Sequence, residues 1–296
     1  MAGRYAFFRG CFIPIRLPHI ESAAIRVFNH LGIELVDVNG FTCCPEPVGF
    51  GINDRLSWLS IAARNISLAE ERALDLVTFC NGCLYTLRHA CHMLREGKLR
   101  GRVNEVLSET GHRFGGSAKV KHFLEVILED VGIDRLRRMV RSPLFGLTVA
   151  THPGCHILSP PEVMDFDDPY DPVVLDDLVR ALGAQPADYD MKADCCGWTL
   201  ANFGQPDASL TLLAEKVRNM REAGADCMVA GCPQCFYQFD MGQLLAARKL
   251  GLEHRVPVFF YHQLLGLAME YGLDGVQYPF HRIKDAEFES KVKSRR

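Results

Sequence analysis

The chain has 296 residues, of which 48% are hydrophobic and 23% are charged, and its formal net charge is −3. This length is enough for one large domain or two ordinary ones, each with its own core, and the composition is that of a soluble globular protein. The charge excludes a broad basic surface for nucleic acid. Two short basic stretches, 135–141 and 291–296, are interpreted as a solvated face and a chain end.

The N-terminus predicts a first strand rather than a targeting segment, because it has no apolar signal region and no cleavage pattern. No apolar run approaches the roughly 18 residues that a membrane span needs. We therefore expect a cytoplasmic, reduced protein without membrane partners. In such a compartment, twelve cysteines favour metal or redox chemistry over a disulfide scaffold.

The first forty residues predict a strand, a helix and a second strand. Residues 5–10 form an apolar, β-leaning run directly before Cys11. Residues 20–31 carry apolar side chains at helical spacing, and 34–38 are typical of a short strand. A cysteine just past a strand lies at the strand's carboxyl end, where open α/β sheets keep their sites.

The remainder of the first half predicts a helix, a buried strand and a final strand–helix pair. The helix includes residues 64–66, the buried strand is 76–80, and 119–125 precede the last helix. Residues 96–118 are polar, contain glycine and occur only in this half, so we interpret them as an insertion or a loop-rich connection.

The second half repeats this order of elements. Its expected segments are a strand at 147–154, a helix at 173–182, a weaker strand within 186–194, a helix through 218–220, a strand at 227–232 and a strand–helix junction at 258–264. On this alignment, residues 218–220 match 64–66, and His262 matches His122.

Strands that alternate with helices predict βαβ units and mainly parallel sheets. The expected fold class is therefore α/β, with two similar domains related by internal duplication. We place the first domain at residues 1–141 and the second at 142–296, where the second ends in the short basic tail.

Ten of the twelve cysteines form one five-cysteine pattern that occurs twice, as C-x31-CC-x35-C-x2-C and C-x39-CC-x35-C-x2-C. The distance from the paired cysteines to C-x2-C is identical in the two copies. A thiolate is a nucleophile and a soft metal ligand, so a repeated spacing of ten thiols specifies chemistry. The members are Cys11, Cys43, Cys44, Cys80 and Cys83 in the first copy, and Cys155, Cys195, Cys196, Cys232 and Cys235 in the second.

The number of ligands separates the candidate metals. A structural zinc and an ordinary 4Fe–4S cubane each take four protein ligands, whereas each copy offers five. Either one cysteine per copy is spare, or the metal centre uses all five and is unusual. We favour a centre that uses all five, because both copies keep them. We also favour an iron–sulfur centre over zinc. Adjacent side chains in an extended chain point apart, so Cys43 and Cys44 share a site only if the backbone turns there. Pro45 and Gly197 follow the two pairs and fit such a turn.

Two cysteines fall outside the pattern. Cys227 begins a buried strand and is interpreted as a small core residue. Cys91 lies between His89 and His92 on a predicted helix. The spacing of these two histidines permits a metal site, but the second copy has no counterpart, which favours an ordinary helix face.

The doubled cysteine pattern resembles the cysteine-rich CCG family, and specifically the B subunit of heterodisulfide reductases, over about residues 3–275. The first copy departs from the family name by reading Cys43-Cys44-Pro45, whereas the second keeps Cys195-Cys196-Gly197. The resemblance implies that each five-cysteine set binds one non-cubane 4Fe–4S cluster, so that all ten cysteines are cofactor-binding metal ligands.

The resemblance also implies an oxidoreductase of methanogenesis that acts as the catalytic component of a complex. The family reaction reduces the mixed disulfide of coenzyme M and coenzyme B to two thiols. Electrons pass from a flavin-containing A subunit through a ferredoxin-like C subunit, often with a hydrogenase or a formate dehydrogenase. This chain has no G-x-G-x-x-G dinucleotide fingerprint after a strand, which agrees with an external electron supply.

Histidines near the predicted cluster loops are the candidates for proton transfer. His152 and His156 flank Cys155 and are the candidate catalytic residues, either as hydrogen-bond donors to cluster sulfur or as proton donors to a leaving thiolate. A purely structural role is the alternative for both. Arg9 and Lys192 are weaker candidates for binding an anionic group of the substrate.

Two other functions remain open on the sequence. One is an iron–sulfur electron-transfer subunit of another oxidoreductase, which would act on a different disulfide, a sulfur carrier, a hydroxy acid or a quinol. The other is a redox-inactive zinc or scaffold protein, against which five thiols per site argue.

Overall fold

The computed structural model of the chain describes residues 3–294. The described residues group into two compact units. Unit 1 contains the stretches up to residue 18, 28–130 and 156–166, and unit 2 contains 19–27, 131–155 and the stretch from 167 onward. The division of the sequence at residues 141 and 142 stays a prediction.

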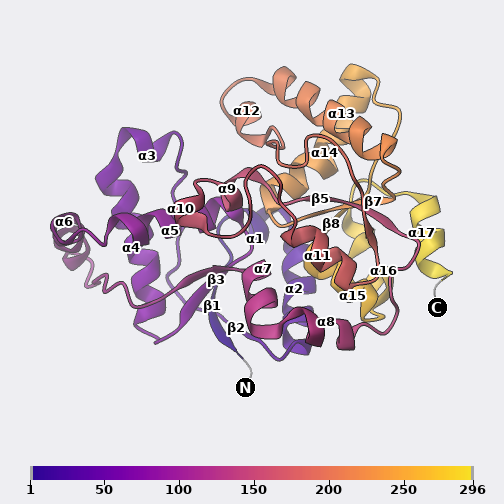
Figure 1. Ribbon diagram of the computed structural model, residues 1–296. Helices are drawn as coiled ribbons and strands as arrows, with labels where there is room; N and C mark the ends of the chain where they lie inside the picture. Colours follow the sequence, from indigo (N-terminus) through magenta and orange to yellow (C-terminus); the bar gives the residue numbers. More distant parts are fainter. Residues whose placement is uncertain (1–2, 295–296) are drawn as a thin grey trace. The chain divides into compact units, whose positions relative to one another are not determined.

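Unit 1 contains a four-stranded parallel sheet. Its strands are β1 (Arg4–Phe8), β2 (Glu34–Val36), β3 (Asp75–Thr78) and β4 (Val120–His122), in the order β2-β1-β3-β4. The apolar side chains of β1 and β3 are buried, as expected for a parallel sheet covered by helices. In Figure 1, α4 lies beside α5 and α6, against which it packs.

In the part that the structure describes, the first half of the chain carries nine helical segments. They are α1 (Phe12–Arg16), α2 (Pro18–His30), α3 (Phe50–Asn53), α4 (Arg55–Glu70), α5 (Asn81–Met93), α6 (Gly97–Ser108), α7 (Phe123–Val126), a π-helical turn (Ile127–Val131) and α8 (Ile133–Met139). Helix α4 begins where the Asp54 carboxylate accepts the Ser57 backbone N–H, a standard helix cap.

The prediction that residues 96–118 form a loop-rich insertion is wrong for their first half. Residues 97–108 form the twelve-residue helix α6, which buries Val103 and Leu107. Its sequence is polar because only this narrow stripe packs inward, so the polar composition concealed the helix.

Unit 2 contains a second parallel sheet with the same strand order. Its strands are β5 (Thr148–His152), β6 (Gln185–Pro186), β7 (Cys227–Ala230) and β8 (Val258–Phe260), in the order β6-β5-β7-β8. The identical order confirms the predicted α/β class and the two similar units. The weak strand expected within 186–194 is wrong except at its first residue, because β6 spans Gln185–Pro186.

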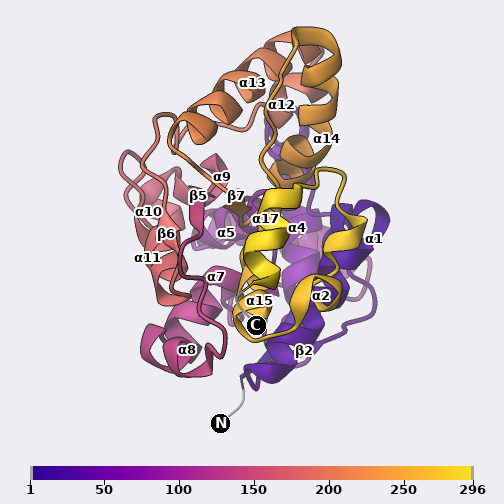
Figure 2. The same ribbon diagram turned by 90° about the vertical axis from the view of Figure 1, so that its right-hand side faces the viewer.

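The second half carries a corresponding set of helices. They are α9 (Cys155–Leu158), α10 (Pro161–Met164), α11 (Val174–Ala181), α12 (Trp198–Asn202), α13 (Pro206–Glu222), α14 (Pro233–Leu250), α15 (Tyr261–Ala268), α16 (Gly272–Gly275), a 3-10 turn (Tyr278–Phe280) and α17 (Ala286–Lys293). Figure 2 shows α12, α13 and α14 gathered together, and these three helices contact one another.

The strand register fixes which residues of the two copies correspond. Tyr5 pairs with Asp75 in β1–β3, and Val149 pairs with Cys227 in β5–β7. It follows that Phe8 of β1 and His152 of β5 occupy equivalent positions, three residues before the first cysteine of each copy.

The same register corrects two of the predicted equivalences. His122 lies opposite Thr78, and the residue in that place in the second sheet is Phe260, so His262 does not correspond to His122. Arg64 precedes the first residue of β3 by the same number of residues that separate Lys216 from the first residue of β7. Arg64 therefore corresponds to Lys216 and not to Arg218. Sequence similarity between short triplets had shifted the alignment by two residues.

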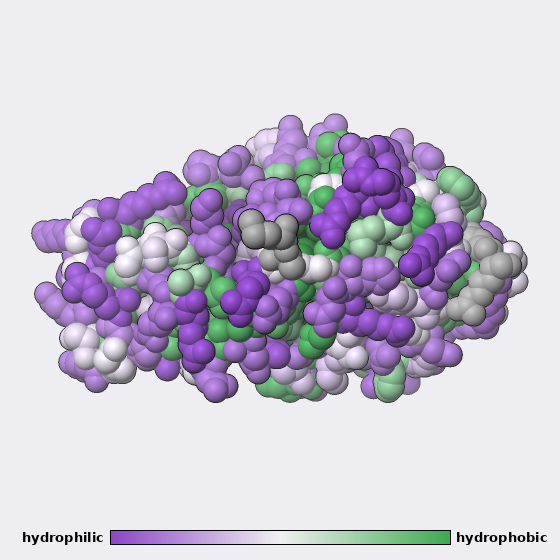
Figure 3. Space-filling view, turned by 90° about the horizontal axis from the view of Figure 1, so that it is seen from below, coloured by the Kyte–Doolittle hydropathy of each residue, from purple (hydrophilic) through white to green (hydrophobic). Residues whose placement is uncertain are grey.

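The surface is mainly polar on the face that Figure 3 shows, with hydrophobic residues dispersed among hydrophilic ones. Within the described stretch of the chain, none of the helices combines the length and the apolar character needed to cross a membrane.

Candidate metal centres

The cysteines of each copy collect at the carboxyl edge of the parallel sheet. In the first copy, Cys11 follows β1, and Cys80 and Cys83 lie at the start of α5, directly after β3. Because β1 and β3 are parallel neighbours, their carboxyl ends meet at one edge. Cys43 and Cys44 lie in the loop that follows β2, the other neighbour of β1.

The five sulfur atoms of the first copy form one continuous series, which we call the first thiol set. Cys11 Sγ lies 3.8 Å from Cys43 Sγ, and Cys44 Sγ lies 2.9 Å from Cys83 Sγ. The Cys43 and Cys44 thiols contact each other, as do those of Cys83 and Cys80. The backbone therefore turns at the paired cysteines and directs both sulfurs into one site.

The second copy reproduces this series in the same order, and we call it the second thiol set. Cys155 Sγ lies 4.0 Å from Cys195 Sγ, and the Cys195 thiol contacts that of Cys196. Cys196 contacts Cys235, which in turn contacts Cys232. Each copy thus presents five soft sulfur donors within contact of one another, a donor set suited to iron–sulfur chemistry.

One thiol in each set is electrostatically distinct. Hydrogen bonds from Cys43 and Cys83 lower the pKa of Cys44 to about 5. Hydrogen bonds from Cys155 and Cys196 lower the pKa of Cys195 to about 2, helped by the Gly197 backbone N–H at 3.4 Å from its sulfur. Each set therefore stabilises a thiolate, which is the form of cysteine that binds metals.

The glycine before the first cysteine keeps space for the thiols. Gly10 has a φ of +67°, and a Cβ atom at this position would lie 2.9 Å from Cys83 Sγ. A side chain here would both strain the backbone and press on the thiol set. The Gly–Cys pair seen in the sequence is therefore a packing requirement of the site.

Side chains from α4 and α5 hold the turn of the first copy. The carbonyl oxygen of Pro45 accepts hydrogen bonds from Trp58 Nε1 at 3.0 Å and Thr86 Oγ1 at 3.1 Å. The buried Asn65 side chain accepts the Thr42 backbone N–H at 2.9 Å and donates to the Cys43 carbonyl at 3.3 Å. Sequence reasoning missed Asn65, which no motif identifies.

A glycine and a lysine hold the turn of the second copy. Gly197 has a φ of +85°, and a Cβ atom there would lie 3.0 Å from the Ser209 carbonyl oxygen of α13. Lys216 of α13 has an exposed fraction of 0%, and its Nζ donates to the carbonyl oxygens of Asp194 at 2.6 Å and Lys192 at 3.4 Å. Sequence reasoning missed Lys216 because its alignment was shifted by two residues.

His152 faces the second thiol set. Its ring is completely buried, and a ring nitrogen lies within 4.8 Å of the Cys196 and Cys235 sulfur atoms. Among the described residues, neither ring nitrogen has a hydrogen-bond partner in good geometry, although the Lys192 backbone lies near the ring. Burial lowers the pKa of His152 well below its usual value, and the Lys216 ammonium lowers it further, so the ring is neutral. A buried imidazole with unsatisfied nitrogens indicates a group that the chain itself does not supply.

The other sequence candidates are placed differently. The ring of His156, on α9, packs edge-on against Tyr85 with their centroids 4.9 Å apart. Arg9 is paired with Asp37 at 2.6 Å, and Lys192 with the buried Asp176 at 2.7 Å. Because both cations are already paired with carboxylates, neither is a strong candidate for binding an anionic substrate group.

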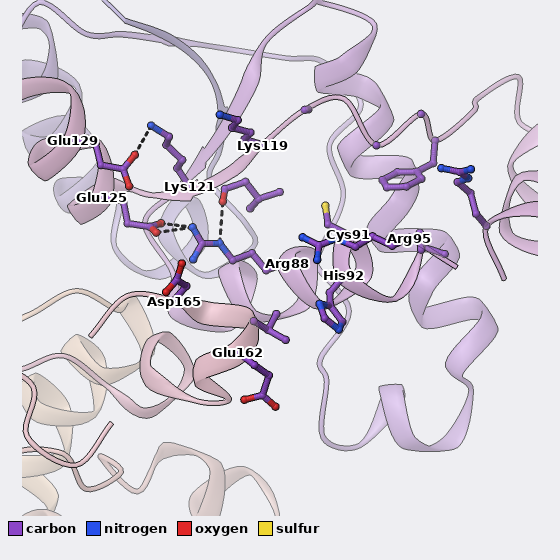
Figure 4. A pocket seen from close by; sticks show the side chains of 18 residues that line it. Arg88, Cys91, His92, Arg95, Lys119, Lys121, Glu125, Glu129, Glu162 and Asp165 are labelled. Atoms are coloured by element: carbon purple, nitrogen blue, oxygen red, sulfur yellow. Dashed lines mark hydrogen bonds and ion pairs between the residues drawn. The ribbon is translucent and has the colours of Figure 1, made fainter. Parts of the chain in front are cut away.

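Cys91 belongs to neither thiol set, and it lines a pocket of about 560 Å³ within unit 1. Figure 4 shows its sulfur near Arg95, and Arg88 forming two bonds to the Glu125 carboxylate across the same pocket, both at 2.6 Å. Burial, with the charge of Glu70, raises the pKa of Cys91 to about 12, so its thiol stays protonated. Cys227 is fully buried in β7, which confirms its assignment to the core.

Comparison with known proteins identifies the repeated unit. The cysteine-rich CCG domain matches the chain twice, at residues 5–88 and 149–240. The chain is 37% identical to the B subunit of the ferredoxin/F420H2-dependent CoB-CoM heterodisulfide reductase of Methanosarcina acetivorans, over 98% of this chain and 97% of that protein. It is 30% identical to the 8-methylmenaquinol:fumarate reductase membrane anchor subunit of Wolinella succinogenes, over 91% of this chain and 93% of that protein.

The fold also matches a solved structure. A hypothetical protein from Helicobacter pylori aligns with a TM-score of 0.78 and 16% sequence identity. The alignment covers 96% of this chain and 52% of that protein, so this likeness concerns the fold alone.

Proposed function

Because the chain belongs to the cysteine-rich CCG family and to its group of heterodisulfide reductase B subunits, we propose that it is the catalytic subunit of a disulfide reductase. It is an iron–sulfur oxidoreductase subunit that acts within a complex. In this proposal, the two thiol sets are its reaction centres. The observation that carries the proposal is the recurrence of five contacting sulfurs in the same order at the same edge of two parallel sheets.

The donor chemistry of each thiol set fits one 4Fe–4S cluster of the non-cubane type. Five contacting thiols exceed the four that a cubane or a zinc ion takes. The space kept by Gly10 beside Cys83 supports a bulky group at the first set, and the unsatisfied nitrogens of His152 support one at the second. When bound, such a cluster would accept and donate one electron at a time.

The proposed reaction is R–S–S–R′ + 2 e⁻ + 2 H⁺ → R–SH + R′–SH. The sulfur–sulfur bond breaks, each sulfur gains one electron and one proton, and two one-electron centres match the two-electron demand. The ten cysteines would hold the two clusters at the carboxyl edges of the sheets. The buried ring of His152 would donate a hydrogen bond to a cluster at the second set. His156 remains a candidate proton donor.

We propose the remaining context from the relatives. The substrate class is a small-molecule mixed disulfide, which in the methanogen relatives is that of coenzyme B and coenzyme M. The electrons come from a flavin-containing A subunit through a ferredoxin-like C subunit, with a hydrogenase or a formate dehydrogenase as a further member. Such a complex would work in the cytoplasm.

A second candidate function is electron transfer in another oxidoreductase. The Wolinella succinogenes relative is named as a subunit of an 8-methylmenaquinol:fumarate reductase, so a protein that is 30% identical to this chain carries a different named reaction. In this case, the clusters would relay electrons to or from a partner that acts on a quinol, a hydroxy acid, a sulfur carrier or another disulfide.

Anaerobic purification followed by iron, sulfide and zinc analysis tests both functions. We expect about eight irons per chain, as two 4Fe–4S clusters require, and an EPR signal that appears when coenzyme M or another thiol is added to the oxidised protein. The Cys91→Ser variant is the control, because Cys91 lies outside both thiol sets, and it should retain the iron and the signal.

Each contrary outcome has a distinct meaning. Eight irons without a response to thiol would contradict a disulfide reductase and favour electron transfer. Zinc without sulfide would contradict both iron–sulfur functions.

A further inference from the structure

The two thiol sets are alike in their sulfurs but differ in the side chains at two equivalent positions. The third residue before the first cysteine is Phe8 in the first copy and His152 in the second. The basic residue that contacts the loop before the paired cysteines is Arg64 in the first copy and Lys216 in the second. At both positions, the side chain of the second copy makes the electrostatic potential at its thiol set more positive than its counterpart does in the first copy.

The replacement of Arg64 by Lys216 is the larger of the two differences between the copies. Its side chain is fully buried, and within residues 3–294 its ammonium forms no ion pair. Its hydrogen bonds go to the carbonyl oxygens of Lys192 and Asp194, in the loop before Cys195. Taking an unpaired ammonium out of water costs several kcal/mol. Burial lowers the pKa of Lys216 to about 8. The carbonyl oxygens of the loop before Cys195 are the polar groups that accept hydrogen bonds from this buried ammonium.

Arg64 makes the equivalent contact in a more exposed setting. Its Nη1 donates to the Gly40 carbonyl oxygen at 2.8 Å, and Gly40 precedes Cys43 by the same three residues that separate Lys192 from Cys195. The arginine is only half-buried, so water and salt screen its charge far more than that of Lys216.

The pair Phe8 and His152 reinforces this difference. Phe8 is fully buried and packs edge-on against Phe41 with their centroids 5.1 Å apart, so it offers the first set no polar group. His152 places a ring nitrogen within 4.8 Å of two sulfurs of the second set. Hydrogen bonds to sulfur and nearby positive charge both raise the reduction potential of an iron–sulfur cluster, because they stabilise the more negative reduced state.

We propose that Lys216, supported by His152, gives the cluster of the second thiol set a higher reduction potential than the cluster of the first. An electron from a one-electron donor then resides on the second set first, and the two halves of the duplicated chain act in a fixed order. This inference rests on the proposed presence of two clusters. In it, Lys216 positions the loop and tunes the potential, and does not touch the substrate.

An EPR-monitored redox titration of the full chain tests the inference, with Cys80→Ser and Cys232→Ser chains used to assign each signal to its set. In Lys216→Met, we expect the potential of the second set to fall by about 59 mV or more, which is a tenfold change in a one-electron equilibrium. Lys216→Arg should keep the original potential, whereas Lys216→Gln should behave like the Met variant if charge is the cause. His152→Phe, which installs the residue of the first copy, should lower the same potential by a smaller amount.

Two controls separate this effect from general charge removal. Lys249→Met removes an exposed lysine that pairs with Asp207, and should leave both potentials unchanged. Arg64→Met should lower only the potential of the first set, by less than Lys216→Met lowers that of the second.

The outcomes distinguish the two proposals. Iron-loaded Lys216→Met and His152→Phe chains with unchanged potentials would overturn this inference and leave the proposed function intact. A wild-type chain without iron and sulfide would overturn the proposed function itself. If Lys216→Met fails to fold, Lys216→Gln and His152→Phe take its place in the test. Unchanged reduction potentials in both of these variants would reject the inference.

Discussion

The two paired-cysteine turns reach the same sulfur arrangement by different means. In the first copy, a proline follows the pair, and side chains of Trp58, Asn65 and Thr86 bind the backbone of the turn. In the second copy, Gly197 takes a left-handed conformation against α13, and the buried Lys216 binds the backbone instead. The positions of the sulfurs are thus common to both copies, while the chemistry that supports them has diverged.

This difference shows which constraints act on each part of the site. Five sulfurs must meet, so the spacing between the paired cysteines and C-x2-C is the same in both copies. The backbone groups of the turn need partners because buried N–H and C=O groups are costly when unsatisfied, but an amide, an indole or an ammonium serves equally well. The support is therefore free to differ, and with it the electrostatic potential at each site.

Substitution of one cysteine in either set should have the largest effect. Cys235→Ser replaces a sulfur that contacts two others, Cys196 and Cys232, by a hard and poorly donating oxygen. We expect the iron content to fall by about half, to about four per chain, as the loss of one 4Fe–4S cluster requires. Iron analysis and EPR measure the loss. Cys83→Ser should lose the same amount of iron but keep the cluster of the second thiol set. If either variant loses both clusters equally, the two sites are not independent.

The next largest effect should separate the two turns. Gly197→Ala should destabilise the chain by about 2–4 kcal/mol, since the left-handed backbone and the close approach to the Ser209 carbonyl both disfavour a Cβ atom. Pro45→Ala should cost less than about 1 kcal/mol, because the carbonyl contacts of the first turn remain. Urea unfolding of the metal-free chain gives both values. Similar costs for the two variants would show that the turns are not supported differently.

Removal of the Asn65 amide should have an intermediate effect. Asn65→Ala leaves the Thr42 N–H and the Cys43 carbonyl without a side-chain partner, at a cost of about 1–3 kcal/mol. Asn53→Ala is the matched control, because its exposed amide donates to the Gly49 carbonyl oxygen at the start of α3, and the change should alter stability by less than about 0.5 kcal/mol. Chemical denaturation measures both, and equal values would remove Asn65 from the support of the turn.

The smallest effect at neutral pH concerns a histidine that only the second copy has. Burial lowers the pKa of His262 from 6.5 to about 3, although its Nε2 donates to the Ile20 carbonyl at 3.1 Å. The unfolded chain therefore binds a proton at this residue near pH 6.5, whereas the folded chain does not until about pH 3. Stability from this group is fully present above pH 6.5 and is lost as the pH falls toward 3, by about 1.4 kcal/mol for each pH unit.

His262→Leu installs the residue found at the equivalent position 124 of the first copy. We expect this variant to lose about 1 kcal/mol at pH 7 through the missing hydrogen bond. Its stability should then decline less steeply than that of the wild type between pH 6.5 and 4. Parallel pH profiles of the unfolding midpoint would show that His262 does not titrate between the folded and unfolded states.

Much of the site is predictable from the sequence because cysteine chemistry is specific. The two five-cysteine sets, their place after β1 and β5, and the turn at each pair follow from spacing and from the rule that parallel strands share a carboxyl edge. The four-stranded parallel sheets follow from the alternation of strands and helices. The two hydrogen bonds that the Pro45 carbonyl oxygen accepts, and the contacts of Asn65 with the turn, are not predictable from the sequence. They depend on which side chains of α4 and α5 lie next to the loop.

The failures of the sequence reasoning have a common physical cause. Helix α6 was missed because it buries only a narrow stripe, and the match of His262 to His122 was wrong because local similarity does not fix register. Register is decided by hydrogen bonds between strands that are distant in the sequence.

The sequence by itself determined the repeated thiol pattern and the duplicated α/β fold, and it predicts a soft-metal site in each copy. Only the tertiary structure decided how the two sites differ. The burial of Lys216, the orphaned ring of His152 and the apolar ring of Phe8 are consequences of packing, and the free energy of a charge or a polar group depends on the surroundings that packing creates.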